Sequence, residues 1–423
     1  MAQTDSEKLT EFIRAQRVRE NVEGLPLKDI RVIDLSTVVA APFAATLLGD
    51  MGAEVIKVEN PNMPDALRAW GIIEDKGIHP FWSVIGRNKL PVTINLKAPE
   101  GKQIFSELIE KSDILIENMR PGTLDKLGFD IESLQRKNPG LIIGKISGYG
   151  QTGPYSSRPG FGTLAEGYSG YTYLNAQPDG IPTNPPMALA DYLAGLHLVF
   201  ALSVALRDQK RGVRGSQVID VSLYEPLFGL LGPDFLSYSL TGEVPQAQGN
   251  ELSYVAPRNS YRTKDEQWAT LSCSAQKPFE RLMDCVGHPE LIQDSRFLSN
   301  DIRSKPENRK VLNEVIGEWI GARDLGEVLE TCDRLGVTIG PITTMKDIDE
   351  DRHYNERGTL IEIEDPVTGT MLRMPNMPFR MAGKPSKIRF PGLPHGAANA
   401  ALYEDLLGYS PDAVEKLKAA KAI

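Results

Sequence analysis

Asp191 stands at the start of a strongly apolar segment, in the stretch ALADYLAG. An aspartate before an apolar helix is usually an N-cap, whose carboxylate accepts hydrogen bonds from the free N–H groups of the first turn. The partial positive charge of the helix N-terminus also favours the ionised carboxylate. An ionised carboxylate can attack an acyl carbonyl and form a covalent intermediate. Gly195, one turn later, has no side chain and is expected to let a bulky substrate approach.

The histidines and cysteines give little support for metal or redox chemistry. The five histidines lack the spacing of metal ligands, so we predict no metal site; they are His79, His197, His288, His353 and His395. We interpret His197, two turns into the apolar segment, as a satisfied core histidine. The three cysteines are too few and scattered for a disulfide framework, which fits a reducing cytoplasm, and we expect them to be buried small hydrophobes; they are Cys273, Cys285 and Cys332.

Dinucleotide binding is disfavoured by the first strand-to-helix turn. The stretch DLSTVVAAPFAATLLGDMG contains no G-x-G-x-x-G, and Ala40 and Ala41 take the place of the glycines that cradle a pyrophosphate. The glycines of GFGTLAEG (160–167) follow a proline with no strand before them, so we interpret them as a turn. We therefore expect no tightly bound cofactor.

The charge of the chain argues against nucleic acid and membrane partners. Lysine and arginine number 47 and aspartate and glutamate 56, which leaves a net charge of −9 and makes any anionic ligand depend on a local basic patch. The polar N-terminus, MAQTDSEKLTEFIRAQRVREN, is not a secretory signal and is expected to form a helical extension. The longest apolar run, 194–206, has about two-thirds of the residues that span a bilayer and is expected to be a buried helix.

Short β-branched runs alternate with helical segments in the first third of the chain. This alternation predicts a parallel sheet with helices on both faces and a ligand crevice at the carboxyl ends of the strands. The expected strands are 30–36, 54–59, 92–97, 113–118 and 141–147, and the expected helices are 40–52, 99–111 and 121–127.

The rest of the chain changes character twice. Residues 149–190 are rich in Gly, Pro, Ser and Tyr, as expected of a long functional loop. An apolar helix at 191–211 and a strand at 217–225 then return the chain to the sheet. From about 245 a smaller α+β domain is expected, with strands at 268–274 and 371–375 and helices at 278–286, 306–322 and 324–335. The tail, 403–423, is expected to be an amphipathic helix.

Four ordered motifs carry a resemblance to a known family. They are RVIDLSTVVAAPFAATLLGDMGAEVIKVE, RNKLPVTINLK, ILIENMRPGTLDKLGF and the long stretch from PPMALADYLAG to DVSLYE. The chain resembles the family III CoA-transferases, the group that includes formyl-CoA transferase and carnitine CoA-transferase. The similarity covers about 29–225 strongly, and 256–272 and 336–345 extend it.

The resemblance implies a mechanism and a set of CoA contacts. Asp191 would attack an acyl-CoA to give an aspartyl mixed anhydride, the CoA thiolate would return to give an aspartyl-CoA thioester, and a carboxylic acid acceptor would reverse these steps. Backbone N–H groups near 149–170 would stabilise each oxyanion. The implied contacts are Val39, Ala40, Asn60, Ile94, Asn95, Leu96, Lys97, Asn118, Met119, Arg120 and Lys126. Of these, Lys97, Arg120 and Lys126 are the expected phosphate ligands; Asn60 replaces an arginine found in some members.

Two alternatives stay open beside acyl exchange. A sister branch, the α-methylacyl-CoA racemases, uses a His-Asp pair after R-x-G, where RPGFG has Phe161 and Gly162, so racemase or epimerase activity is disfavoured. The other alternative is a non-catalytic CoA-binding subunit paired with a catalytic homologue. Glu166 is interpreted as a loop or helix-surface acid, and Arg258 either holds an acceptor carboxylate or makes a structural pair.

We expect a two-domain α/β enzyme with a Rossmann-like parallel sheet. Its large CoA-binding domain would be 1–230, completed by 395–423, and a linker (231–250) would lead to a small α+β domain (251–370) and a returning linker (371–394). By resemblance, two chains interlock as a homodimer, with a heteromer of homologues as the alternative. Segments 149–190 and 226–260 are expected to shape the acyl pocket. They do not specify the acids exchanged. By resemblance, a dicarboxylate donor such as succinyl-CoA is common in the family.

Overall fold

The structure is a computed structural model that describes residues 3–17, 24–178, 180–212, 217–383 and 386–423. Its contacts divide the chain into two compact units. The first unit comprises Met1–Tyr171, Pro185–Phe235 and Glu356–Ile423, and the second comprises Thr172–Asn184 and Leu236–Asn355. Residues 356–370, expected in the small domain, therefore lie in the first unit.

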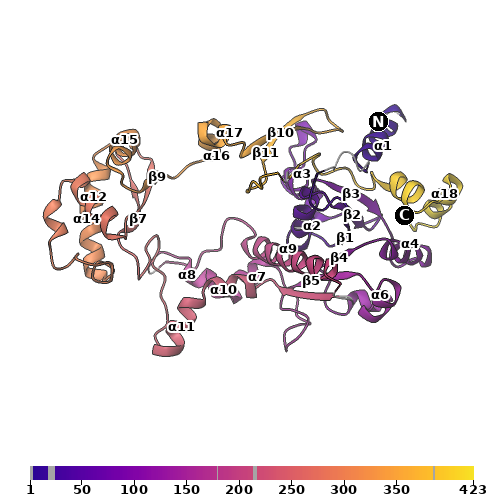
Figure 1. Ribbon diagram of the computed structural model, residues 1–423, viewed down its shortest axis with the longest axis horizontal. Coiled ribbons are helices and arrows are strands. Elements are labelled where there is room, and N and C mark those ends of the chain that lie inside the picture. The colour runs from indigo at the N-terminus through magenta and orange to yellow at the C-terminus, as the bar shows by residue number, and fades with distance from the viewer. Residues whose placement is uncertain (1–2, 18–23, 179, 213–216, 384–385) are drawn as a thin grey trace. The chain divides into compact units, whose positions relative to one another are not determined.

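A six-stranded parallel sheet forms the centre of the first unit (Figure 1). Its strands are β1 (Arg31–Leu35), β2 (Glu54–Glu59), β3 (Lys89–Thr93), β4 (Ile114–Glu117), β5 (Ile142–Ser147) and β6 (Gln217–Ser222). They lie in the order β3-β2-β1-β4-β5-β6, so the chain reverses its direction of winding between β1 and β4. Open α/β sheets bind ligands outside the carboxyl ends of the strands at such a reversal. The predicted mixed α/β architecture with a parallel sheet is confirmed.

Strand β3 begins three residues earlier than expected. It includes Lys89 and Pro91, two residues that are unusual in a buried strand. The expected strand was 92–97. Pro91 lies on the edge strand of the sheet, where a missing N–H is tolerated. Lys89 is fully buried, and its ammonium donates to the carboxylate of Asp34 at 2.8 Å. The expected start at residue 92 was wrong, since the strand begins at Lys89 and includes both residues.

Two separate hydrophobic cores cover the two faces of the sheet. Successive β1 residues take opposite sides: Val32 packs with α2 (Ala40–Asp50) and α9 (Leu189–Lys210), and Ile33 packs with α4 (Pro99–Glu110) and α6 (Ile131–Lys137). Strands buried on both faces read as continuous apolar runs, which is why these strands were visible in the sequence.

Helix α9 buries one side and exposes the other. Ala194, Leu198 and Leu202 are fully buried, whereas Phe200 is 70% exposed. His197 is also exposed, so its interpretation as a core histidine was wrong. The helix is long and apolar enough to span a membrane by length and composition. A core helix of a soluble protein passes the same test, and the buried side of α9 packs against α2 and the sheet.

The chain ends pack beside the sheet of the first unit. Helix α1 (Gln3–Arg17) forms the expected N-terminal extension. The tail is two short elements rather than one helix: the π-helical η5 (Ala401–Leu406) and α18 (Pro411–Ala419). Gly408, with a φ of +76°, interrupts them, since the left-handed conformation favours glycine. A two-stranded antiparallel sheet of β10 (Leu360–Glu364) and β11 (Met371–Pro375) also belongs to this unit.

The second unit is small and mixed. An antiparallel sheet of β7 (Arg258–Arg262), β8 (Trp268–Ser272) and β9 (Ile339–Pro341) packs with α12 (Gln276–Val286), α14 (Pro306–Gly321) and α15 (Leu325–Leu335). Cys273 and Cys332 are buried, as expected, and Cys285 is half-buried.

The remaining helices within the described residues are short. They are η2 (Ala66–Ala69), η3 (Glu74–Lys76), α3 (Pro80–Ile85), α5 (Thr123–Lys126), α7 (Gly162–Tyr168), α8 (Tyr171–Leu174), α10 (Glu225–Leu230), α11 (Gly232–Thr241), η4 (Pro289–Ile292), α13 (Asn300–Arg303), α16 (Met345–Glu350) and α17 (Arg352–Glu356).

Candidate active site

A cavity of about 190 Å³ lies at the carboxyl ends of β1, β4 and β5, beside the reversal of the sheet. Five residues expected from the sequence line it: Ala40, Asn118, Met119, Arg120 and Asp191. The other lining residues are Thr37, Val38, Pro121, Ile146, Ser147, Gly148, Arg158, Pro159, Gly160, Phe161 and Leu223. Six separate segments of the sequence therefore converge on the cavity.

The carboxylate of Asp191 lies in the first turn of α9. The N-cap of α9 is Ala188, so Asp191 is the third residue of the helix and not the expected cap. Burial, and after it the nearby negative charge of Glu166, raise the pKa of Asp191 to about 6. Hydrogen bonds from the backbone N–H groups of Asp191 and Ala40 act in the opposite direction. The group is thus mostly ionised at neutral pH while remaining only partly hydrated.

Glu166 is a buried second carboxylate beside the start of α9. It lies in α7 and is 2% exposed, so its interpretation as a surface acid was wrong. Its carboxylate accepts the N–H of Ala190 at 3.4 Å, and burial raises the pKa of the group. Glu166 therefore accepts a free N–H at the start of α9, as an N-cap side chain would. Its negative charge also disfavours ionisation of Asp191.

Gly162 gives Asp191 its space. A Cβ on residue 162 would stand 1.9 Å from Oδ2 of Asp191. Gly195 has a different role from the one expected. A Cβ on Gly195 would stand 2.6 Å from the carbonyl oxygen of Ala40, so this glycine permits α2 and α9 to pack closely and does not open a path for substrate.

A group of buried charged residues surrounds the turn between β1 and α2. The sequence analysis did not predict this group. Asp34, Lys57 and Lys89 are fully buried on three adjacent strands, and Asp65 follows β2. The signal was present as charged residues inside otherwise apolar strands, in RVIDL and EVIKVE. A charge in a strand buried on both faces must be paired, and these four residues pair with one another.

Arg158 is a further cavity residue that the sequence did not single out. Its guanidinium lies 3.5 Å from the ring centroid of Tyr155, within a cluster of four tyrosines. The cluster consists of Tyr149, Tyr155, Tyr168 and Tyr224. Arg120 and Arg158 are both exposed cations at one cavity, which gives an otherwise acidic chain a local basic patch.

The remaining expected CoA contacts lie outside the lining of this cavity. The side chains of Val39, Ile94 and Leu96 are buried in the core, which leaves only their backbone for a ligand. The amide of Asn95 donates to the carbonyl of Lys421, and Nε2 of His395 lies 3.1 Å from the carbonyl oxygen of Asn60. The two remaining residues of the set, Lys97 and Lys126, are exposed.

Arg258 belongs to β7 of the second unit. Its guanidinium donates to the carbonyl of Asn250 at 2.9 Å. This contact is structural, which was one of the two roles expected for Arg258. The alternative role with an acceptor carboxylate stays a prediction.

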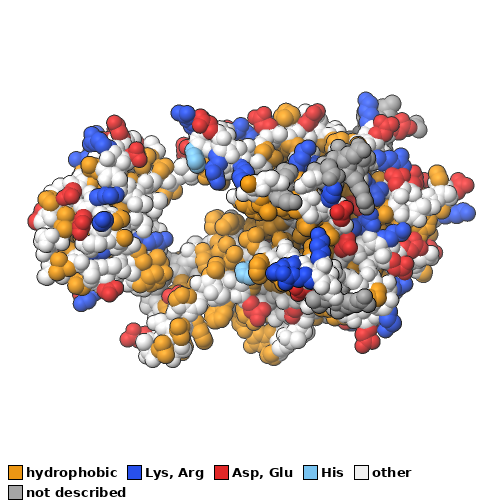
Figure 2. Space-filling view, viewed as in Figure 1, with side chains coloured by type: hydrophobic (Ala, Val, Ile, Leu, Met, Phe, Trp, Pro, Cys, Tyr) orange, Lys and Arg blue, Asp and Glu red, His pale blue; other side chains and the backbone are white. Residues whose placement is uncertain are grey.

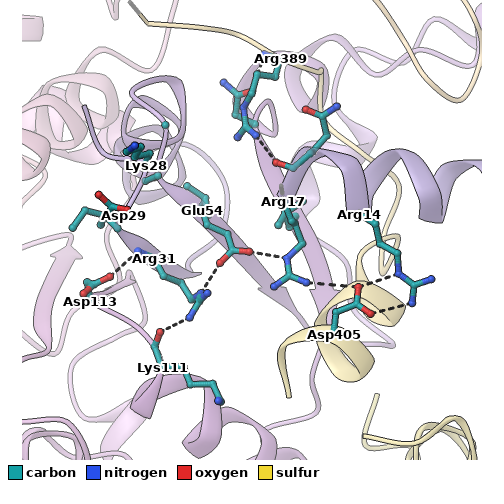
Figure 3. Close-up of a pocket in the computed structure, with 17 residues that line it drawn as sticks. Arg14, Arg17, Lys28, Asp29, Arg31, Glu54, Lys111, Asp113, Arg389 and Asp405 are labelled. Atoms are coloured by element: carbon teal, nitrogen blue, oxygen red, sulfur yellow. Dashed lines mark hydrogen bonds and ion pairs between the residues drawn. The ribbon is translucent and has the colours of Figure 1, made fainter. Parts of the chain in front are cut away.

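A second cavity, of about 480 Å³, lies at the amino ends of the strands and is built of ion pairs (Figure 3). Glu54 accepts from Arg17 at 2.7 Å and from Arg31 at 2.5 Å. Arg14 pairs with Asp405 at 2.9 Å. These contacts join α1 and the tail to the sheet, so we interpret the cavity as a structural junction.

Hydrophobic side chains gather on one surface of the first unit, over α7, α9 and α10 (Figure 2). The most exposed large hydrophobic side chains of these helices are Leu164 of α7 at 52%, Phe200 of α9 at 70% and Leu230 of α10 at 63%. Within the described residues no cluster of three or more His, Cys, Asp or Glu side chains is arranged to hold a metal ion.

The fold has solved relatives. A CaiB/BaiF family protein from Brucella suis superposes with a TM-score of 0.78 at 30% sequence identity, covering 90% of this chain and 99% of that structure. The similarity extends over both units, since it spans most of the chain.

Sequence relatives agree with the structural likeness. The chain is 38% identical to the succinyl-CoA–L-malate CoA-transferase beta subunit of Chloroflexus aurantiacus, over 94% of this chain and 98% of that protein. It is 32% identical to the succinate–glutarate CoA-transferase of Agrobacterium fabrum, over 90% and 96%. A family model described as CoA-transferase family III matches residues 27–399. The chain belongs to the family III CoA-transferases.

Proposed function

We propose that the protein moves CoA from an acyl-CoA donor to a carboxylic acid acceptor through covalent intermediates on Asp191. The observation that carries this proposal is the placement of the Asp191 carboxylate in a cavity at the carboxyl ends of the strands, beside the N–H of Ala40. With a pKa of about 6, the carboxylate is an anion at neutral pH and is less hydrated than a surface group. Both properties favour attack on a thioester carbonyl.

In each proposed step a carboxylate or a thiolate attacks an acyl carbonyl and displaces another carboxylate or thiolate. A carboxylate oxygen of Asp191 attacks the thioester carbonyl, the C–S bond breaks, and CoA leaves as a thiolate from an aspartyl mixed anhydride. The thiolate then attacks the aspartyl carbonyl, which releases the donor acid as a carboxylate and leaves an aspartyl-CoA thioester. The acceptor carboxylate repeats these steps in reverse and regenerates Asp191. No proton is transferred in any step, so the cavity requires no histidine beside Asp191.

We propose that donor and acceptor are dicarboxylates, with succinyl-CoA as donor. The named relatives act on succinyl-CoA with L-malate or D-citramalate, or on succinate with glutarate. The exposed guanidinium group of Arg158 supports this proposal, since a second carboxylate needs a cation at the same cavity.

We propose that CoA enters with its thioester in the cavity and its nucleotide outside. The cavity of about 190 Å³ is too small for a whole CoA molecule. Asn118, Met119 and Arg120 at the rim would meet the pantetheine and pyrophosphate, and the more distant expected contacts would lie along the nucleotide, including Asn60, Lys97 and Lys126.

The racemase alternative is less well supported. The family branch that moves an α-proton carries its acid-base pair where this chain has Phe161 and Gly162. Here the space beside Gly162 is filled by the Asp191 carboxylate, so a side chain on 162 and the proposed nucleophile exclude each other. Incubation in deuterium oxide without an acceptor acid tests this alternative, because a racemase would exchange the α-hydrogen of the acyl group.

We propose an interlocked homodimer in the cytoplasm. The exposed apolar surface over α7, α9 and α10 supports burial against a second copy. The alpha and beta subunits among the relatives make a heteromer the alternative, in which this chain binds CoA without acting alone. Light scattering during dilution of the pure protein tests the homodimer, and turnover by the pure protein would exclude the non-catalytic alternative.

Trapping of the intermediate is the direct test of the proposed nucleophile. Protein incubated with succinyl-CoA and then with hydroxylamine or borohydride is digested, and the peptide containing Asp191 is expected to carry the modification. Asp191→Ala is expected to abolish turnover while CoA still binds. Asp208→Ala, near the other end of α9, is the matched control and is expected to retain turnover. An active enzyme with unmodified Asp191 would contradict the proposal.

A further inference from the structure

The turn between β1 and α2 holds a residue in an unfavourable conformation. Val38 has a φ of +67°, in the left-handed region that a β-branched residue rarely adopts. Such conformations persist only where surrounding contacts determine them, and they concentrate at functional sites. Two residues later, Ala40 begins α2 and lines the same cavity as Asp191, and its backbone N–H lowers the pKa of that carboxylate. The conformation of Val38 therefore sets the direction of a backbone N–H at the cavity that holds the proposed nucleophile.

Asp65 supplies the contact that holds Val38. Both of its carboxylate oxygens accept the N–H of Val38, at 3.1 Å and 3.3 Å. Oδ1 also accepts the N–H of Leu67 at 3.1 Å, which makes Asp65 the N-cap of η2. Asp65 is 3% exposed, so water is a poor substitute for these contacts.

Lys57 lies behind Asp65 and fixes its orientation. The ammonium is 3.1 Å from Oδ2 of Asp65, is fully buried, and also donates to the carbonyl of Ser36. Its other neighbour is Asp34, at 3.9 Å. Buried charges at this depth are stable only when paired and hydrogen-bonded, so neither partner can turn away without leaving the other uncompensated.

A second set of contacts fixes the two ends of the turn. The side-chain amide of Asn118 donates to the carbonyl of Thr37 at 2.8 Å and accepts the N–H of Thr37 at 2.9 Å. The ammonium of Lys89 bridges the carboxylate of Asp34, at 2.8 Å, and the carbonyl of Pro42 in the first turn of α2, at 2.7 Å. These contacts hold both ends of the turn in place. The conformation of the turn between them then depends on the backbone at Val38, whose N–H is held by Asp65.

We propose that Asp65 is a positioning residue: backed by Lys57, it holds Val38 in its left-handed conformation and so aims the N–H of Ala40 at the carboxylate of Asp191. This inference rests on the proposed role of Asp191 as nucleophile. It assigns a function to a buried carboxylate that does not line the cavity.

Asp65→Asn is the informative substitution. It keeps the size of the side chain but places an NH₂ donor against either the ammonium of Lys57 or the N–H of Val38. We expect kcat to fall about tenfold, within the range of coupling between residues in one network. We also expect the acidic limb of the kcat/KM profile to move to higher pH, since the misaligned N–H of Ala40 no longer favours the ionised carboxylate.

Val38→Gly is the partner substitution. Glycine adopts positive φ without steric cost, so a turn with glycine at 38 needs less support from Asp65. In the Val38→Gly background we expect Asp65→Asn to lower kcat less than about threefold and to leave the acidic limb in place. A residue that only stabilises the fold would lower kcat by the same factor in both backgrounds, and that result would overturn the proposal. Asp130→Asn, at the N-cap of α6, controls for loss of a capping carboxylate and is expected to leave kcat unchanged.

Stability gives an independent measurement if Asp65→Asn does not fold. Val38→Ala and Val38→Gly both lose the valine side chain, but only alanine keeps the cost of positive φ. We expect Val38→Gly to melt several degrees above Val38→Ala, and the opposite order would overturn the proposal. Trapping on Asp191 in the wild-type protein separates the two hypotheses: a trapped intermediate with equal kcat factors contradicts only the role of Asp65, and an absent intermediate contradicts the proposed function itself.

Discussion

Oδ2 of Asp191 lies 1.9 Å from the point that a Cβ on Gly162 would occupy, so the candidate nucleophile fills the space that a side chain at 162 would need. Asp191 lies in the first turn of α9 and Gly162 is the first residue of α7, and the two meet only in the folded chain. The α-carbon of Gly162 thus forms one wall of the pocket around the carboxylate. Gly162 is therefore as much a part of the candidate site as the residues with functional groups.

Gly162→Ala is expected to displace the carboxylate of Asp191 and to lower kcat/KM at least about 100-fold, since misplacement of a reacting group by about 1 Å has that effect. Gly167→Ala is the matched control in the same helix, because a Cβ there would meet nothing within 4 Å. Steady-state kinetics of both variants checks the prediction. Wild-type rates in Gly162→Ala would show that the carboxylate does not act where it lies.

The rate is expected to depend on pH through Asp191. Since the ionised form is the nucleophile and its pKa is about 6, kcat/KM is expected to fall as pH decreases through 6. Glu166→Gln removes a neighbouring negative charge, which favours ionisation and moves this limb to lower pH. The amide oxygen of the substituted side chain would still accept the N–H of Ala190, so the start of α9 keeps its partner. A limb that moves upward or stays in place would contradict the assigned electrostatics.

Ionisation of Asp191 is expected to lower the free energy of unfolding. Its pKa is raised from 3.8 to about 6 on folding, so the folded protein binds the proton more tightly than the unfolded chain. Stability therefore falls as pH rises from about 4 to about 6 and is constant above. Asp191→Asn removes this cost and is expected to stabilise the fold by about 3 kcal/mol at pH 8 and by nothing below about pH 4. Urea unfolding at the two pH values measures the difference, and an equal effect at both would be inconsistent with it.

Arg120 is expected to bind the phosphates of CoA. Arg120→Ala should raise KM for succinyl-CoA about tenfold, change kcat little, and weaken the salt dependence of kcat/KM, because a lost charge-assisted contact affects binding rather than chemistry. Arg136→Ala, an exposed arginine of α6 that pairs with Glu132, serves as the control. A loss confined to kcat would assign Arg120 to the acyl group instead.

Glu54 is expected to stabilise the junction in Figure 3. Although burial alone would raise its pKa, Arg31 and Arg17 lower the pKa of Glu54 below its usual value. A lowered pKa means that its stabilisation is present above about pH 4 and is lost as pH falls through the folded pKa. Glu54→Gln should cost about 1–3 kcal/mol at pH 7 and less in acid. Thermal unfolding checks this, and Glu132→Gln, on an exposed ion pair, should change little.

The strands of the parallel sheet could be predicted because their residues face apolar surroundings on both sides. Ile33 and Val32 belong to different cores, and both are buried, so the whole run is apolar and visible in the sequence. The error at β3 has the same origin: Lys89 breaks the apolar pattern, and its burial depends on Asp34, which lies 55 residues away in sequence. Pairing between strands cannot be read from one strand.

The side chains of the site were only partly predictable. Asp191, Ala40 and Asn118 each lie at the end of an element that the sequence pattern locates, and their convergence follows from the rule that parallel strands end at one edge. Arg158 and Glu166 lie in a stretch without periodicity, so no pattern indicated that one would line the cavity and the other would be buried.

The sequence by itself determined the alternation of strands and helices, the acidic charge and the aspartate at the head of an apolar helix, because these depend on residue type and local spacing. The tertiary structure decided that Gly162 leaves room for Asp191, that Gly195 serves helix packing, and that Asp65 supports Val38. Steric exclusion and the pairing of buried charges act between segments far apart in the chain, so they exist only once those segments have been brought together.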